Sequence, residues 1–320
     1  MPDSLQSLIR HTGPRSRLRW LTPQLQEPRA VRGQDPIAAR QSLIGSLNCI
    51  HPNRLQVIGH AELVYLAGLG ANARAETLVK LFSERPAAVI FSDSIEPDKA
   101  FCDHAKRTGT PLLGTPVSDE ELINQLRYYL THALAESTTL HGVFIEVLGM
   151  GVLLVGEPAV GKSELALDLI SRGHRLIADD APLFARVAPE QIEGRCPEPL
   201  RDFLEVRGLG VLNIRAMFGE GALAWRKTLN LIIDLKPLDQ SVLEHIDRLT
   251  GSLSATNVLG VTVPHFTMPV APGRNLAILV EATVRHQILR IRGYDAGADF
   301  IDRQARAIAN DRPDPPGTRS

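Results

Sequence analysis

An eight-residue phosphate-binding motif is the clearest chemical signal in this 320-residue sequence. The pattern G-x-x-x-x-G-K-S lets backbone amides turn inward around an anion, while its lysine reaches the outer phosphates and its serine hydroxyl ligates Mg²⁺. An apolar run over 151–155 precedes the motif and a helical pattern over 162–172 follows it, which is the context that a phosphate loop requires. Motors, GTPase switches and kinases share this motif, so the reaction stays open. The predicted nucleotide-binding residues are Gly156, Glu157, Pro158, Ala159, Val160, Gly161, Lys162 and Ser163.

Two consecutive carboxylates follow the next predicted strand, over 176–178. In a strand, loop, helix and strand unit we expect the second strand to return beside the first, which brings Asp179 and Asp180 to the mouth of the phosphate site. An aspartate there can ligate a metal or accept a proton from an attacking hydroxyl. The alternative is a pair of carboxylates that only caps or salt-bridges a neighbouring element.

The segment 203–210 is the second concentration of signal. Glu205 and Arg207 lie two residues apart, so in an extended strand both side chains point to one face. One interpretation is a salt-bridged strand edge. The other is a metal carboxylate that complements Ser163, beside a glycine-containing phosphate-binding loop. Taken alone, three further polar residues are ordinary surface or packing residues: His141, Arg248 and Arg274.

The composition bounds the class of protein. With 44% apolar residues, 22% charged residues and a net charge of −1, the chain is typical of globular proteins and has no basic block for dedicated nucleic-acid binding. No apolar stretch is long enough to span a bilayer, and charged residues occur where a signal peptide would have its apolar core, so we expect a cytoplasmic protein without a membrane partner. The three cysteines are odd in number and far apart, which favours reduced structural thiols.

The chain is long enough for two α/β domains. Residues 1–135 are predicted to form an assembly or regulatory domain whose polar leader, to about residue 40, is loosely ordered. Residues 136–312 are predicted to form a catalytic domain in which a hairpin leads into the phosphate loop, and 313–320 a disordered tail. The predicted strands of the first domain are 55–59 and 88–91, and the predicted helices of both domains are 62–69, 99–106, 118–135, 162–172, 275–286 and 299–309.

Together these residues resemble the bacterial HPr kinase/phosphorylase family, most densely over 141–180, 204–213 and 269–276. The resemblance implies a phosphate-loop catalytic domain of the phosphoenolpyruvate-carboxykinase-like type with a smaller N-terminal α/β domain, assembled as a homohexamer. It implies an Mg²⁺-dependent enzyme that phosphorylates a serine of the carrier HPr, or an HPr-like carrier, from ATP or pyrophosphate. The reverse activity is phosphorolysis by inorganic phosphate, which releases pyrophosphate.

The resemblance also implies roles for single residues. Asp180 matches the base that takes the serine proton and returns it in the reverse reaction, while Ser163 and Glu205 match the Mg²⁺ ligands. The other residues matching the catalytic set are His141, Lys162 and Arg248. The stretch matching the signature for both reactions is Leu204, Glu205, Val206, Arg207, Gly208, Leu209, Gly210, Val211, Leu212 and Asn213. The stretch matching the dephosphorylation region is Pro269, Val270, Ala271, Pro272, Gly273 and Arg274.

Two other function classes compete with this interpretation. A small-molecule kinase related to phosphoenolpyruvate carboxykinase would act on a metabolite hydroxyl and need no HPr. A non-enzymatic nucleotide sensor would keep the phosphate loop without turnover. The presence of Asp180 beside the loop residues argues against the sensor, because a sensor needs no base.

Overall fold

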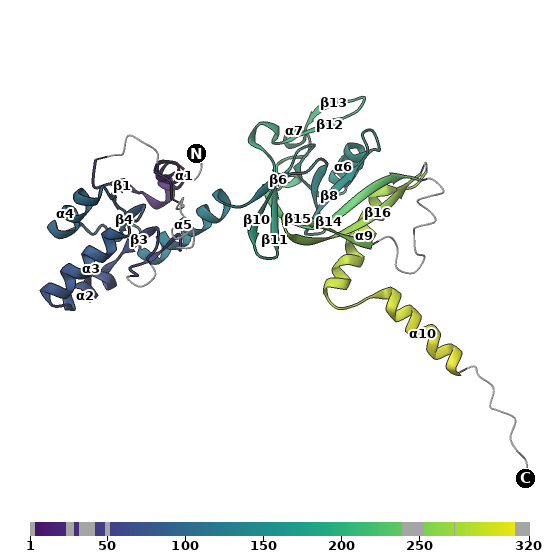
Figure 1. The fold of residues 1–320 in the computed structure, drawn as a ribbon. Coiled ribbons are helices and arrows are strands. Elements are labelled where there is room, and N and C mark those ends of the chain that lie inside the picture. The colour runs from purple at the N-terminus through teal and green to yellow at the C-terminus, as the bar shows by residue number, and fades with distance from the viewer. Residues whose placement is uncertain are drawn as a thin grey trace, which may run out of the picture. The chain divides into compact units, whose positions relative to one another are not determined.

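The computed structural model describes residues 4–23, 29–31, 42–48, 52–238, 253–271 and 273–310. The chain divides into two compact units, Met1–Ala135 and Glu136–Ser320 (Figure 1). Each unit has its own sheet and its own buried apolar clusters.

The first unit is built on a five-stranded sheet in the order β1-β5-β4-β3-β2, parallel except for β1 at one edge. Parallel neighbours need crossover connections, and helices supply them, as predicted for a small α/β unit. The strands are β1 Arg19–Trp20, β2 Ile44–Ser46, β3 Leu55–Ile58, β4 Ala88–Phe91 and β5 Leu112–Gly114. The helices are α1 Leu5–Ser16, α2 His60–Gly68, α3 Ala71–Ser83, α4 Lys99–Thr108 and α5 Asp119–Ala133.

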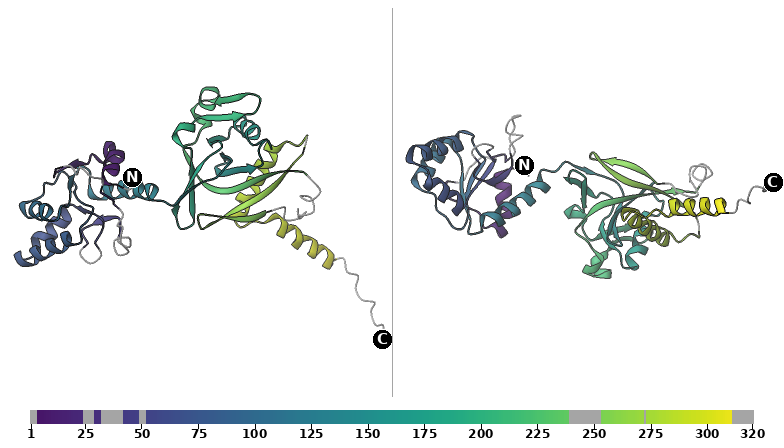
Figure 2. Two further views of the ribbon diagram at one scale, coloured as in Figure 1. Left: turned by 45° about the horizontal axis from the view of Figure 1, so that its top comes forward. Right: turned by 90° about the horizontal axis from the view of Figure 1, so that it is seen from below.

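Helices cover both faces of this sheet (Figure 2). On one face, Leu8 of α1 and Leu126 of α5 pack with Val57 and Ile90 of the strands. On the other face, Phe82 of α3 and Phe101 of α4 lie in a second cluster. The strands are buried on both sides, which explains why they appear in the sequence as short continuous apolar runs.

The expectation of a loosely ordered leader is wrong for its first part. Leu5–Ser16 forms α1, and the side chains of Leu5 and Leu8 are fully buried against the sheet and α5. The three-residue spacing of these leucines places both on one helix face, but the polar residues around them hid that period. Helix α3 was not predicted. Residues 24–28 and 32–41 of the leader lie outside the described part of the chain.

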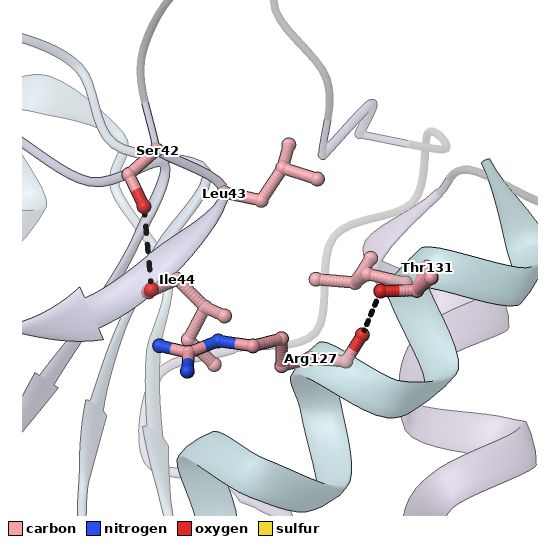
Figure 3. A pocket seen from close by; sticks show the side chains of 6 residues that line it. Ser42, Leu43, Ile44, Arg127 and Thr131 are labelled. Carbon is pink, nitrogen blue, oxygen red and sulfur yellow. Dashed lines mark hydrogen bonds between the residues drawn. The ribbon is translucent and has the colours of Figure 1, made fainter. Parts of the chain in front are cut away.

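A pocket of about 210 Å³ lies between the start of β2 and the last turns of α5 (Figure 3). Among the described residues, Arg127 is the charged residue on its wall, and no acid or histidine lines it. The described part of the lining thus provides no group that could act as a base for phosphoryl transfer. The lining residues are Ser42, Leu43, Ile44, Arg127, Leu130 and Thr131.

The second unit is built on a nine-stranded sheet around the long strand β14. One path through it runs β6-β10-β11-β14-β8-β7-β9, and β16 also pairs with β14 and carries β15 at its other edge. A separate hairpin is formed by β12 and β13. The strands before the hairpin are β6 Ser137–Thr139, β7 Val143–Val147, β8 Met150–Gly156, β9 Arg175–Ala178, β10 Leu183–Ala188 and β11 Gln191–Arg195. The others are β12 Phe203–Val206, β13 Gly210–Asn213, β14 Arg226–Pro237, β15 Leu253–Val258 and β16 Val261–Val270.

Helices α6 and α9 pack on one face of this sheet, where Leu165 and Val280 meet Leu154 and Ile233. A second apolar cluster includes buried side chains of β10, β11, β15 and β16 and contains the ring pair Phe144 and Phe184. The predicted hairpin before the phosphate loop is confirmed, because β7 and β8 pair antiparallel. The predicted helices over 275–286 and 299–309 are confirmed as α9 and α10. The helices in the described part of this unit are α6 Lys162–Ser171, α7 Ile214–Phe218, α9 Leu276–Ile291 and α10 Ala296–Asn310, with short 3-10 turns at Glu198–Leu200 and Glu220–Ala222.

Within the described ranges, no helix is both long enough and apolar enough to cross a membrane. The tail predicted to be disordered, 313–320, falls outside those ranges.

Candidate active site

The phosphate loop joins the buried strand β8 to helix α6. Gly156 has φ +143°, and a Cβ there would lie 2.6 Å from the carbonyl oxygen of Leu235, so only glycine fits. Gly161 (φ +99°) caps α6, which begins at Lys162. The first amides of α6 therefore point into the loop, where they can bind phosphate oxygens. The Lys162 ammonium spans the loop and donates to the carbonyl oxygens of Gly156 and Glu157, at 2.9 and 3.0 Å.

The strand that carries the two aspartates does not lie next to β8. Strand β7 is inserted between β8 and β9 and is antiparallel to both, so the expectation that the second strand returns beside the first is wrong. Because β8 and β9 still run in the same direction, their carboxyl ends reach the same edge of the sheet. Asp179 and Asp180 therefore follow a strand that ends at the same edge as β8, with one strand in between.

The Asp180 carboxylate lies at this edge beside His141. His141 Nδ1 is 4.0 Å from Asp180 Oδ1, and the two side chains are 86% and 84% exposed. Asp180 has a left-handed backbone (φ +63°), and its carbonyl oxygen accepts a hydrogen bond from the Gly142 amide at 3.0 Å. Gly142 has φ +149°, and a Cβ there would lie 2.3 Å from the Leu154 carbonyl oxygen. Glycine at 142 thus allows the close backbone approach that brings His141 to Asp180.

The signature stretch folds as the β12–β13 hairpin, beside α6 and α7 in Figure 1. Leu204 and Val206 are buried in the same apolar cluster as α6, so Glu205 between them points outward and is exposed. Among the described residues, the Glu205 carboxylate has no ion-pair partner. The expectation that Arg207 shares a strand face with Glu205 is wrong, because β12 ends at Val206 and Arg207 lies in the turn.

Further contacts hold this hairpin in place. At its base, Arg215 donates to both carboxylate oxygens of Asp202, at 2.7 and 3.1 Å. Along β12, the Glu205 amide donates to Asp179 Oδ2 at 2.8 Å. Burial raises the pKa of the Asp179 carboxyl above its ordinary value. Sequence reasoning placed Asp179 near the phosphates, but its bond to the hairpin had no sequence signal.

The stretch matching the dephosphorylation region begins at the end of β16. Strand β14 pairs in parallel with both β16 and β8. Leu235 of β14 is opposite both Gly156 of the phosphate loop and Met268 of β16. Pro269 and Val270 are the last paired residues of β16, so the chain leaves the sheet after them at the same edge as the phosphate loop. Arg274 is exposed. Pro272 and Arg248 lie outside the described residues.

The donor set at this edge fits a magnesium ion carried with a nucleotide. Ser163 in the first turn of α6 provides a hydroxyl oxygen, and Glu205 provides an exposed carboxylate without an ion pair. Mg²⁺ prefers such oxygen ligands, and it is commonly bound by one or two side chains together with phosphates and water rather than by a full protein cage. Accordingly, no cluster of three or more acidic, histidine or cysteine side chains occurs within the described ranges.

A phosphate loop with a carboxylate at the same edge of its sheet is typical of phosphoryl-transferring enzymes. Comparison with known sequences agrees: residues 132–304 match the family model "HPr Serine kinase C-terminal domain", and residues 4–130 match "HPr Serine kinase N terminus". The chain belongs to the HPr kinase/phosphorylase family, and as a kinase of this family it uses a nucleotide.

Individual relatives show how far the similarity extends. HPr kinase/phosphorylase from Xanthomonas campestris pv. campestris (strain B100) is 46% identical over 297 residues, which cover 92% of this chain and 94% of the relative. The protein of the same name from Xylella fastidiosa (strain M12) is 46% identical over 292 residues, 91% of this chain and 92% of the relative. The solved Hpr(Ser) kinase/phosphatase from Coxiella burnetii is 34% identical, with a TM-score of 0.45, and the match covers 51% of this chain and 98% of that one.

Proposed function

We propose that this protein is a bifunctional HPr kinase/phosphorylase acting in the cytoplasm. In the forward direction it transfers a phosphoryl group from ATP, or from pyrophosphate, to a serine hydroxyl of HPr or an HPr-like carrier. In the reverse direction inorganic phosphate attacks phosphoserine, which yields serine and pyrophosphate. The observation that carries this proposal is the exposed Asp180 carboxylate, 4.0 Å from His141, at the sheet edge where the phosphate loop ends.

The exposure of the acid favours a protein substrate over a small molecule. Small-molecule sites usually enclose most of the ligand surface in a cavity. Asp180 is 84% exposed, so a serine on the surface of a folded protein can reach it. This distinguishes the proposal from the alternative of a metabolite kinase.

Each side chain then has a defined task. Phosphoryl transfer depends chiefly on positioning and on neutralising charge. Lys162 and the first amides of α6 hold phosphate oxygens, and Ser163 and Glu205 would hold Mg²⁺, which supplies further positive charge when bound. Asp180 accepts the serine proton in the forward reaction and returns it to the leaving serine oxygen in reverse, as microscopic reversibility requires. We assign His141 to orienting the Asp180 carboxylate.

The family resemblance also supports the roles proposed for Arg248 and for the stretch from Pro269 to Arg274. We propose that Arg248 contributes positive charge at the transferred phosphoryl group and that the Pro269–Arg274 segment serves chiefly the dephosphorylation. We further propose a homohexamer in which 1–135 serves assembly or regulation. A sizing measurement by light scattering tests the hexamer.

The deciding experiment incubates the purified protein with HPr, Mg²⁺ and either ATP or pyrophosphate, and detects phosphoserine by mass spectrometry. HPr in which the acceptor serine is alanine is the matched control. Addition of inorganic phosphate to phosphorylated HPr should release pyrophosphate. Absence of transfer to HPr from both donors, or transfer to a metabolite pool instead, would contradict the proposal.

A further inference from the structure

Asp179, which has no assigned role, connects the strand of the proposed base with the hairpin of the proposed metal carboxylate. It follows β9 directly and precedes Asp180 in the chain. Its Oδ2 accepts the Glu205 amide at 2.8 Å across 26 residues of sequence.

The contact acts on the backbone of the residue that would ligate the metal. The Glu205 side chain points away from the core because Leu204 and Val206 on either side are buried. Its position is therefore set by where the β12 backbone lies. The core holds one face of this strand, and the Asp202 and Arg215 pair holds the hairpin base. Within the described ranges, Asp179 holds the Glu205 amide itself.

The same residue is rigidly joined to the base. Asp180 has a left-handed backbone, and its carbonyl oxygen is bonded to the Gly142 amide at 3.0 Å, so the turn after β9 is tied to the start of β7. A shift of Asp179 would move the two carboxylates of the site relative to each other. Phosphoryl transfer requires the hydroxyl, the phosphorus and the bound cation to be aligned, so this spacing matters.

We propose that Asp179 is a positioning residue, which sets the distance between the proton-accepting carboxylate of Asp180 and the metal-binding carboxylate of Glu205 through its hydrogen bond to the Glu205 amide. The inference rests on the function proposed above for Asp180 and Glu205. It requires an acceptor oxygen at 179 and no negative charge, because the bond to an amide needs only an acceptor.

The test compares Asp179→Asn, which keeps an acceptor oxygen at the same position, with two other variants. Asp179→Ala removes the acceptor, and Asp179→Ser has a side chain too short to place its oxygen at the Glu205 amide. Hydrogen–deuterium exchange of the peptide covering 203–213 reports the hairpin directly. Mn²⁺ binding in the presence of a non-hydrolysable ATP analogue, followed by electron paramagnetic resonance of free Mn²⁺, reports the metal site without turnover. Glu205→Gln is the matched control, because it removes the ligand and leaves the backbone amide in place.

We expect faster exchange of the hairpin and Mn²⁺ binding weakened by roughly 10- to 100-fold in Asp179→Ala and Asp179→Ser, the usual cost of losing a group that orients a metal ligand. Asp179→Asn should stay close to the unmodified protein in both measurements. Glu205→Gln should lose Mn²⁺ binding with unchanged exchange.

Two results would overturn the inference. If Asp179→Asn impaired Mn²⁺ binding as much as Asp179→Ala, the charge itself would be needed and Asp179 would act directly on metal or substrate. If hairpin exchange were unchanged in Asp179→Ala and Asp179→Ser, the bond would not position β12. Failure of the proposed function would look different, because the unmodified protein would then neither bind Mn²⁺ with nucleotide nor phosphorylate HPr, while the exchange result would still be readable.

Discussion

Strands β7 and β9 carry one charged pair near each end, and the two pairs differ in almost every physical respect. At one end, Arg175 donates to Glu146 at 2.6 and 2.7 Å, Lys227 Nζ lies 3.0 Å from the same carboxylate, and Glu146 is 11% exposed. At the other end, His141 and Asp180 are 4.0 Å apart and almost fully exposed. The same two strands therefore provide a neutralised ion cluster at one end and, at the other, the exposed side chains for which we propose catalytic roles.

The difference in partners explains the difference in role. Burial acts to raise the pKa of Glu146, but hydrogen bonds from Arg175 and Lys227 outweigh it and lower that pKa below its ordinary range. A carboxylate held in that way has little capacity to exchange protons near neutral pH. Asp180 has no arginine or lysine partner among the described residues, so its carboxylate stays available to a substrate hydroxyl.

The largest effect of a substitution is expected at the exposed end, which carries Asp180. Replacing Asp180 by asparagine removes the proton acceptor, and we expect phosphorylation and phosphorolysis of HPr to fall by about 10²- to 10⁴-fold. Nucleotide binding, measured by calorimetry, should change little because Lys162 and the loop amides remain. Near-normal turnover in this variant would show that another group accepts the proton.

At the buried end, loss of the Glu146 carboxylate should lower the stability of the folded protein. Glu146→Ala removes the hydrogen bonds from Arg175 and Lys227 to their common buried carboxylate, so we expect the free energy of unfolding to fall by about 2 to 3 kcal/mol. Urea titration measures the effect. The matched control is Asp302→Ala, which breaks an exposed i,i+4 ion pair with Arg306 and should cost less than about 0.5 kcal/mol. Equal losses in both variants would mean that burial does not distinguish the two ion pairs.

A second buried carboxylate, that of Glu281, makes the free energy of unfolding dependent on pH. Hydrogen bonds from Arg172, the largest cause, and from His174 lower the pKa of Glu281 from 4.5 to about 2. Its folded pKa is depressed, so its contribution is complete above pH 4.5 and is lost as the pH falls toward 2. The shift corresponds to about 3 kcal/mol.

Urea unfolding across this pH window measures that contribution. Glu281→Gln should show a shallower loss of stability between pH 4.5 and 2, because the titrating group is absent. If the variant and the unmodified protein lost stability in parallel, the depressed pKa of Glu281 would not contribute to the acid dependence.

The smallest effect is expected at His141. Its contact with Asp180 is long and exposed, so we expect His141→Gln to lower both activities only about tenfold, well short of the loss in Asp180→Asn. Initial rates in both directions measure it. A loss as large as that of Asp180→Asn would show that His141 itself takes part in proton transfer.

Local signals predicted the elements around the site well. The glycines of the phosphate loop and the apolar runs beside it correctly predicted β8, α6 and the hairpin that includes β7, because turn geometry and side-chain periodicity are encoded within a few residues. The signature stretch was harder, because Gly208 and Gly210 signal a turn without showing whether Arg207 belongs to that turn or to the strand before it. Helix α1 was missed because its two buried leucines are surrounded by polar residues.

Local sequence was sufficient to predict a phosphate-loop motif at Gly156–Ser163, and Asp179 and Asp180 at the end of the strand that follows its helix. These follow from spacing and from the chemistry of the side chains. Only the tertiary structure decided that β7 separates β8 from β9, that Asp179 holds the Glu205 amide and that Glu281 joins Arg172 and His174 from more than 100 residues away. Contacts of this kind depend on which distant elements pack together, and that is a property of the whole core rather than of any local segment.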